Sequence, residues 1–236
     1  MSNNYFSFKQ FTVNQDACAM KVGTDGVLLG AWTRLALSVT SILDVGCGTG
    51  LIALMLAQRC RAPVMAIDID DMAVCQARDN FLRSPWHDSM TAIQGDFITM
   101  PETGKYDVIV SNPPFFKNAL DSPDEHRSMA RSNFSLSYPD LISKVSRMLS
   151  DAGHFSLIVP SEYEPCLRAL SVANGLYVSR CTRVRTKACK PVTRVLMDFT
   201  NDAGALCEEN ELILLDDSGS KSSDYVNLTG EYYINC

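Results

Sequence analysis

Residues 41–61 read SILDVGCGTGLIALMLAQRCR, which predicts a buried strand, a glycine-rich turn and a helix in direct succession. The first five residues are mostly aliphatic, as in a strand that is covered on both faces. Gly46, Gly48 and Gly50 then allow the backbone to turn sharply and to approach a ligand closely. The apolar run that begins at Leu51 continues as a helix to about Arg61. This succession is typical of the first unit of an α/β fold that binds a ligand at the turn.

Strands and helices keep alternating along the chain after this unit. Further helices are predicted at 71–83, 139–150 and 161–174, and further strands at 64–68, 91–94, 108–110 and 155–159. Such alternation predicts a parallel sheet whose ligands bind at the carboxyl ends of the strands. Two longer β-rich segments, 177–185 and 193–199, are expected to pair antiparallel at one edge. The predicted fold class is therefore α/β, with a doubly wound, mostly parallel, seven-stranded Rossmann-like sheet.

Length and composition favour a single globular domain over residues 1–236, in which residues 1–40 form an N-terminal flap over the ligand site. The longest apolar run, Leu51–Ala57, is too short to cross a membrane. The N-terminus lacks the pattern of a secretory signal, so we expect a cytoplasmic protein. The three histidines are isolated from one another and from any cysteine pair, so no metal site is expected. The sequence leaves the oligomeric state open.

A second informative stretch, YDVIVSNPPFF at residues 106–116, ends the fourth predicted strand. Asn112 offers a side-chain amide oxygen as an acceptor. The two prolines that follow have no N–H, so carbonyl groups near them are left for a ligand to bond. Phe115 and Phe116 offer flat faces on which a planar group can stack. The stretch suits a planar amine such as the amino group of a nucleobase; the alternative is a strand-ending turn with two phenylalanines in the core.

Carboxylates stand at the ends of three predicted strands. Asp44 directly precedes the glycine turn, Asp68 ends the second strand and Asp96 follows the third. A carboxylate beside the turn repels a pyrophosphate and attracts an ammonium, which favours a cationic nucleoside joined to an amino acid, such as S-adenosylmethionine. We expect Asp44 near its α-amino group, Asp68 at the ribose diol and Asp96 at the adenine amine. The alternative is that these residues cap helices, and Asp70 and Asp71 compete with Asp68 for that role.

Together these motifs resemble the class I S-adenosylmethionine-dependent methyltransferases that methylate amino groups. Further stretches that narrow the resemblance are FKQFTV at 8–13, KVGTDGVLLGAW at 21–32, and YVNLT at 225–229 with Tyr232 and Tyr233. They are similar to the bacterial tRNA (adenine-N6) methyltransferases that modify adenine 37 of a valine tRNA. The resemblance spans nearly the whole chain, although residues 201–224 contribute nothing to it. It implies S-adenosylmethionine as cofactor, tRNA as partner, and Lys21 and Thr24 as further cofactor-binding residues.

N-methylation of adenine, which the resemblance implies, has to overcome the weak nucleophilicity of the N6 amine, whose lone pair is conjugated with the ring. We expect the Asn112 side-chain oxygen and the Pro113 carbonyl to accept the two amine hydrogens and turn the lone pair toward the sulfonium methyl. Asn112 is also expected to contact the cofactor, and Phe115 to stack on the base. Most of the acceleration would come from this alignment, for which roughly 7–11 kcal/mol is accessible.

Basic residues are candidates for contacts with the RNA backbone. The segment from Pro165 to Met197 contains seven basic residues and no acidic one, although the formal net charge of the chain is −6. The polar loop at 117–134 directly follows the Asn-Pro-Pro turn and carries two further arginines. The candidate RNA-binding residues are Phe116, Arg127, Arg131, Arg183, Arg185, Lys187 and Lys190. The alternatives are a solvated loop and an edge strand that its charges protect from aggregation.

The Asn-Pro-Pro turn leaves other methyl acceptors open. These are guanine N2 in ribosomal RNA, adenine in DNA and the glutamine amide of a release factor. A different class of protein is a non-catalytic one that binds RNA or senses S-adenosylmethionine. Such a protein would keep its activity when Asn112 is replaced by alanine.

Overall fold

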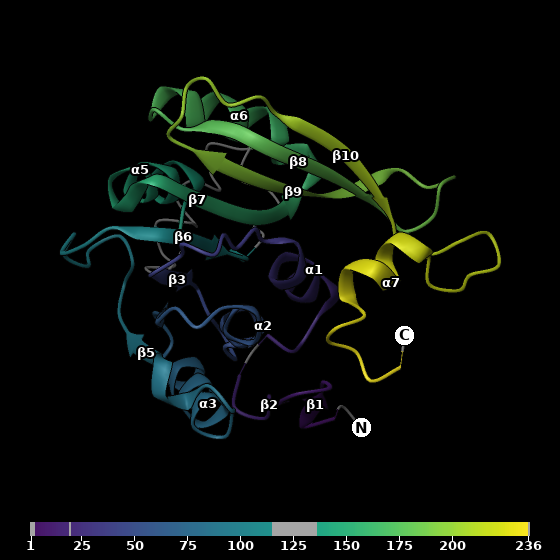
Figure 1. Ribbon diagram of the computed structural model, residues 1–236, viewed down its shortest axis with the longest axis horizontal. Helices are drawn as coiled ribbons and strands as arrows, with labels where there is room; N and C mark the ends of the chain where they lie inside the picture. Colours follow the sequence, from purple (N-terminus) through teal and green to yellow (C-terminus); the bar gives the residue numbers. More distant parts are fainter. Residues whose placement is uncertain (1–2, 19, 115–135, 236) are drawn as a thin grey trace, which may run out of the picture.

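The computed structural model describes residues 3–18, 20–114 and 136–235, and its centre is an eight-stranded sheet (Figure 1). The strand order is β10-β8-β9-β7-β6-β3-β4-β5. The strands are β3 (Ile42–Val45), β4 (Val64–Asp68), β5 (Met90–Gln94), β6 (Tyr106–Ser111), β7 (Leu149–Pro160), β8 (Tyr177–Arg185), β9 (Val192–Thr200) and β10 (Glu208–Ile213). A separate antiparallel hairpin pairs β1 (Tyr5–Ser7) with β2 (Thr12–Asn14).

The strand directions confirm the predicted α/β class. Neighbours in the run β5, β4, β3, β6 and β7 are all parallel, and β9 is antiparallel to both β7 and β8, as predicted for the two long β-rich segments. The sheet has one strand more than the seven predicted, because β10 adds parallel to β8 and moves the antiparallel pair one strand inward. Since β8 points the same way as β7, the loop after β8 lies at the edge where the parallel strands end.

Helices cover both faces of the sheet (Figure 1). One face carries α1 (Thr24–Trp32), α2 (Leu51–Arg59), α3 (Asp71–Leu82) and α7 (Ser223–Thr229); the other carries α5 (Tyr138–Met148) and α6 (Glu164–Ala173), while η1 (His87–Ser89) and η2 (Ser161–Tyr163) are single 3-10 turns. α2 is buried from Leu51 to Ala57 because it packs against β3, β4 and α1, and the segment after α7 also contacts it through Tyr232. The two helices approach so closely that a Cβ on Gly30 would lie 2.8 Å from the Met55 sulfur. Among the helices described, none is both long and apolar enough to cross a membrane.

The β1–β2 hairpin packs against the segment that follows α7, so the two ends of the described chain meet (Figure 1). The Lys9 backbone N–H donates to the Tyr232 carbonyl at 2.8 Å, and the Lys9 Nζ donates to the Gly230 carbonyl at 2.7 Å. The rings of Phe8 and Tyr233 stack with centroids 5.9 Å apart. These contacts fix the start of the segment that leads from the hairpin to the ligand site.

Candidate active site

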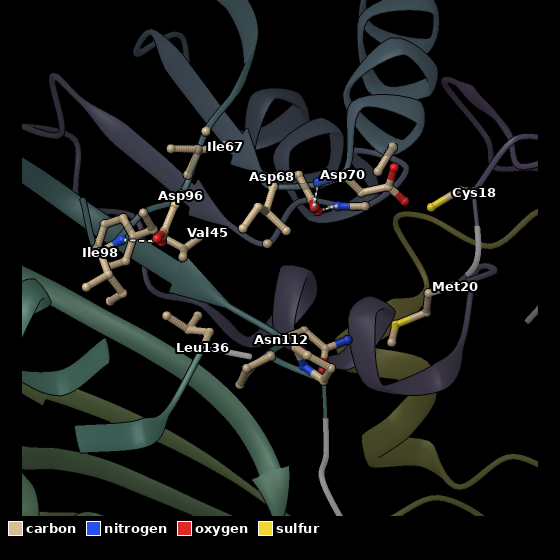
Figure 2. Close-up of a pocket in the computed structure, with 18 of the residues that line it drawn as sticks. Cys18, Met20, Val45, Ile67, Asp68, Asp70, Asp96, Ile98, Asn112 and Leu136 are labelled. Carbon is tan, nitrogen blue, oxygen red and sulfur yellow. Dashed lines mark hydrogen bonds between the residues drawn. The ribbon is translucent and has the colours of Figure 1, made fainter. Parts of the chain in front are cut away.

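A cavity of about 390 Å³ opens at the carboxyl ends of β3, β4, β5 and β6, where the sequence predicts the ligand site (Figure 2). We call it the strand-end cavity, because the turns that follow these strands supply most of its wall. A second cavity of about 410 Å³, lined mainly by residues 20–26 and the turn before α2, is called the α1 cavity. The two cavities share Met20, Gly46, Gly48 and Asn112 in their walls. They therefore form two halves of one site.

The glycine turn between β3 and α2 borders both cavities. Gly46, Gly48 and Gly50 have φ angles of 72°, 53° and 78°, the left-handed region that favours glycine. A Cβ on Gly46 would meet no atom within 4 Å, whereas a Cβ on Gly50 would overlap the ring of Phe81. Glycine is thus required for packing at position 50, and at position 46 it leaves room for a ligand.

Asp68 and Asp96 lie in the wall of the strand-end cavity, as the sequence predicts. Asp68 accepts the Gly48 N–H at 2.8 Å and the Asp70 N–H at 3.0 Å, so it also fixes the glycine turn. One oxygen of Asp96 accepts the Ile98 N–H at 2.8 Å. The carboxylates in this wall favour a cationic ligand over a phosphate. No group of three or more His, Cys, Asp and Glu side chains in the described chain is arranged to hold a metal.

Asp44 lies beneath the glycine turn and lines neither cavity, unlike its expected contact with a ligand ammonium. Asp44 and Ile42 share the face of β3 that meets α2, so the carboxyl group points into the helical layer. Its Oδ2 accepts the Ala53 N–H at 3.1 Å, and no described group bonds its Oδ1. Burial raises the pKa of Asp44 to about 7, while the Ala53 N–H opposes the rise and the Asp68 charge adds to it. Asp44 therefore bonds the first turns of α2 and lies outside the walls of both cavities.

Lys21 and Thr24 line the α1 cavity together with Gly23, Asp25 and Gly26. Gly23 is the N-cap residue of α1, and because glycine has no side chain, it cannot cap the N–H groups of the first turn. The first N–H groups of a helix lack partners within the helix, and they carry the positive end of its dipole. Together with the Lys21 ammonium, they make this half of the site suitable for a carboxylate.

Asn112 stands where the two cavities meet. The pairing of Val45 with Ser111 sets the residue after β6 beside Gly46, and the Ser111 hydroxyl donates to the Val45 carbonyl at 2.8 Å. Asn112 lines both cavities, whereas Pro113 lines the strand-end cavity. In Figure 2 the Asn112 side chain lies across the drawn pocket from Asp68. Its Oδ1 is buried, and no described donor reaches it. A buried oxygen without a donor calls for one from a ligand.

Several residues of the wall were not predicted from the sequence. Cys18 and Met20 reach the strand-end cavity from the segment before α1, and Ile98 reaches it from the turn after β5 (Figure 2). Phe97 of the same turn also lines this cavity. The expected N-terminal flap already pointed to Cys18 and Met20. Phe97 and Ile98 directly follow Asp96 in the sequence, and this position could have identified them. The other part of the predicted flap, α1, is a core helix, because its residues 26–32 are buried.

The predicted RNA-binding residues fall into three groups. Phe116, Arg127 and Arg131 lie outside the described residues, as does Phe115, which was predicted to stack on the base. Lys187 and Lys190 lie in the loop between β8 and β9, at the same sheet edge as the two cavities. Lys190 is exposed and Lys187 is half-buried. Arg183 and Arg185 form the third group, which lies on β8.

The arginines of β8 are engaged by carboxylates. Arg183 donates to Glu164 at 3.0 Å and to Glu209 at 2.7 Å, and Arg185 donates to Glu211 at 2.7 Å. The hydrogen bonds that Arg183 donates to Glu164 and Glu209 raise the pKa of Arg183 above its ordinary value. Glu209 and Glu211 belong to β10, the strand that was not predicted. The positive charge on β8 is therefore largely matched within the protein.

The fold and the site define the chain as a methyltransferase. The methyltransferase small domain family matches residues 27–163, which is more than half of the chain. A predicted O-methyltransferase from Agrobacterium tumefaciens superposes with a TM-score of 0.69 at 17% identity, over 90% of this chain and 100% of that one. The ribosomal protein L11 methylase from Lactobacillus delbrueckii superposes with a TM-score of 0.58 at 15% identity, over 80% and 83%. These two structures share the fold, and the chain belongs to the methyltransferase small domain family.

Curated relatives define the family more narrowly. A protein of Bacteroides fragilis is 46% identical over 99% of this chain and 99% of its own length. A protein of Aeromonas hydrophila is 40% identical over 98% of both chains. Both are named tRNA1(Val) (adenine(37)-N6)-methyltransferase, and this chain belongs to their family.

Proposed function

We propose that this protein transfers a methyl group from S-adenosylmethionine to N6 of adenine 37 in a valine tRNA. The reaction is the one named for its full-length relatives. The observation that carries the proposal is the buried Asn112 Oδ1, which has no described donor at the junction of two cavities. An adenine amine supplies the missing donor. A tRNA substrate also implies a cytoplasmic enzyme.

The two cavities fit the two ends of S-adenosylmethionine. In the strand-end cavity, Asp68 would accept the ribose hydroxyls and Asp96 the adenine amine, and Phe97 would pack against the base. In the α1 cavity, Lys21 and the first turn of α1 would bind the carboxylate of the amino-acid end. The open space at Gly46 lies between these positions. Bound there, the cofactor supplies an electrophilic methyl group on a positively charged sulfur.

The polypeptide contributes mainly orientation. Asn112 Oδ1 and the Pro113 carbonyl accept the two hydrogens of the amine, which draws its lone pair out of conjugation with the ring. Holding the reacting groups in line is worth roughly 7–11 kcal/mol in favourable cases. Phe115 would stack on the extruded base, at about 1–3 kcal/mol for a stacked base, and Phe116 would contact the RNA. An anticodon-loop adenine is unpaired, so extruding it costs little.

Contacts to the tRNA backbone are assigned to cations that are not needed to hold the fold. Lys187 and Lys190 fit this description, because their loop lies at the edge of the site. Arg127 and Arg131 join them in the proposal, since their loop directly follows the Asn-Pro-Pro turn. Arg183 and Arg185 hold β10 in place, and any contact they make with RNA competes with these ion pairs.

The decisive experiment is methylation of valine tRNA transcripts with labelled S-adenosylmethionine, followed by nucleoside mass analysis. N6-methyladenosine is expected in the natural sequence and not in a transcript with guanosine at position 37. N2-methylguanosine, label in protein, or label in duplex DNA would each reject the assignment.

Asn112→Ala tests the proposed acceptor. Without Oδ1 the amine loses one partner, so kcat should fall by about 10²–10³-fold, as when one oriented hydrogen bond is removed from an active site. S-adenosylmethionine binding, measured by calorimetry, should change far less. An unchanged kcat would mean that Asn112 does not orient the amine.

The Lys187→Glu/Lys190→Glu double variant tests the RNA contacts. Charge reversal should raise the KM for tRNA and leave both the affinity for S-adenosylmethionine and the stability unchanged. Arg183→Glu is the matched control on β8, directly before this loop. For this variant we expect a loss of stability that is larger than any change in the KM for tRNA. If the lysine variant keeps the wild-type KM at low and moderate salt, the loop does not bind RNA.

A further inference from the structure

The segment between β2 and α1 shapes both halves of the site. Its described residues, 15–18 and 20–23, contribute Cys18 and Met20 to the strand-end cavity and Lys21 to the α1 cavity. None of these described residues belongs to a helix or a strand, so ladder hydrogen bonds do not fix their position. Something else must hold this backbone against the body of the protein.

The side chain of Asn80 on α3 meets this requirement. It is 1% exposed, and its Oδ1 accepts the backbone N–H of Asn14 at 2.8 Å. Its Nδ2 donates to the Asn14 carbonyl at 2.9 Å and to the Thr49 carbonyl, also at 2.9 Å. One amide therefore joins the end of β2 to the glycine turn. Only a group with one acceptor and two donors satisfies all three partners.

Two further buried amides hold the same segment. Gln76, one turn before Asn80 on α3, is 6% exposed and accepts the Ala17 N–H at 3.0 Å. Gln15, also 6% exposed, accepts the Val22 N–H at 2.8 Å and so closes the segment into a loop. The backbone is thus held at its start, middle and end by amide side chains.

The same helix also holds the other wall of the site. α3 begins after Asp70, whose side chain accepts the Met72 N–H, and Asp70 itself donates to Asp68. Gly50 packs against the Phe81 ring so closely that a Cβ would not fit. The distance between the glycine turn and the N-terminal segment is therefore set by α3 through Asn80.

We propose that Asn80 is a positioning residue for S-adenosylmethionine binding. It holds the N-terminal segment and the glycine turn at the spacing that the cofactor requires, without touching the cofactor itself. This inference rests on the methyltransferase function proposed above. Gln76 supports the same segment from the next turn of the helix.

Asn80→Asp tests this role with little change in shape. The variant keeps the acceptor for the Asn14 N–H, but it places an oxygen against the carbonyls of Asn14 and Thr49. We expect the Kd for S-adenosylmethionine, measured by calorimetry on the full chain, to rise about tenfold or more, from the loss of two hydrogen bonds. The KM should rise in parallel while kcat at saturating cofactor stays within about twofold. Amide hydrogen exchange should quicken at Asn14 and Ala17.

Asp198→Asn is the matched control. It exchanges a carboxylate for an amide, the reverse of Asn80→Asp, at another buried position. Asp198 is 1% exposed, accepts the hydroxyls of Ser156 and Ser179, and lines neither cavity. It should lower the melting temperature and leave the Kd for S-adenosylmethionine unchanged. A purely structural role for Asn80 predicts the same pattern in both variants.

The outcomes separate the two proposals. If the wild type does not bind S-adenosylmethionine, the proposed function fails and this inference fails with it. If the wild type binds but folded Asn80→Asp keeps the wild-type Kd, only the role of Asn80 is overturned. An equal loss of affinity in Asp198→Asn overturns it as well. Should Asn80→Asp not fold, Gln76→Leu takes its place, and we expect the same rise in the Kd for S-adenosylmethionine. A wild-type Kd in folded Gln76→Leu would then overturn the proposed positioning role.

Discussion

The carboxyl group of Asp44 shows what a single residue contributes beneath the glycine turn. Its raised pKa of about 7, against an ordinary value of 3.8, means that the folded protein binds this proton more tightly than the unfolded chain does. The stability from Asp44 is therefore complete below pH 3.8 and is lost as the pH rises to about 7. Above that pH the loss stays constant.

Asp44→Asn should remove this dependence on pH. We expect the variant to be more stable than the wild type at pH 8, by up to about 4 kcal/mol, and the difference to shrink toward pH 4. Thermal unfolding in a series of buffers without cofactor measures both proteins. A difference that is the same at every pH would show that the Asp44 carboxyl group does not titrate as described.

Gly50 and Gly175 separate backbone strain from steric overlap. Both have positive φ, at 78° and 73°, but a Cβ would overlap Phe81 at Gly50 and would meet nothing within 4 Å at Gly175. Gly175→Ala should cost about 1–2 kcal/mol from the left-handed conformation alone. Gly50→Ala should cost a further 1–3 kcal/mol or so from overpacking. Urea unfolding measures both, and equal costs would contradict the overlap.

At the residue scale, the sequence predicted correctly which residues lie at the sheet edge. It was less successful in predicting the direction in which their side chains point. Asp68, Asp96 and Asn112 end or follow strands and reach the wall of the site. Asp44 lies within β3, where alternation turns its side chain toward α2. The pattern of the strand contained this information, since Ile42 shares its face.

At the scale of elements, β10 shows why one strand escaped prediction. Its sequence, Glu208 to Ile213, is rich in glutamate, and glutamate is depleted in strands. The strand forms because Glu209 and Glu211 lie beside the arginines of β8. This complementarity joins two segments that are distant in sequence, so local propensity does not reveal it. The strands and helices with apolar periodicity were mostly predicted to within a few residues, except that β7 begins at Leu149, six residues before the predicted strand at 155–159.

Arg183→Glu should destabilise the β8–β10 pair. The change removes the bonds to Glu164 and Glu209 and sets like charges against each other, at a cost of about 1–3 kcal/mol. The effect should shrink in 1 M salt, because Arg183 is 35% exposed at its side chain. Adding Glu209→Arg should restore part of the stability. Chemical unfolding of the single and double variants measures this coupling, and strictly additive losses would show that the pair does not interact.

At the scale of the molecule, the alternation of strands and helices was enough to predict a doubly wound sheet and the edge that carries the site. It did not predict how the two ends of the chain meet. The Lys9 Nζ and the Gly230 carbonyl are 221 residues apart in sequence, and no local pattern marks such a pair. The closure depends on Tyr232, which is 2% exposed and whose hydroxyl donates to the Met55 carbonyl at 3.2 Å.

Tyr232→Phe and Tyr232→Ala should measure this closure. Removing only the hydroxyl should cost about 1 kcal/mol, whereas removing the ring should cost about 3–5 kcal/mol. In the alanine variant, limited proteolysis should also cut the β1–β2 hairpin, because its partner segment is no longer held. Equal protection of the hairpin in both variants would show that Tyr232 does not secure it.

Because Lys9 bonds Gly230, the hairpin can complete its contacts only late in synthesis on the ribosome. The hairpin leaves the ribosome 221 residues before the carbonyl that its lysine binds, a delay on the order of 10–45 s at roughly 5–20 residues per second. Until then, the β1–β2 hairpin lacks its contacts with Gly230, Tyr232 and Tyr233. Nascent chains that stop short of Gly230 should therefore leave the hairpin open to proteases, and the completed chain should protect it.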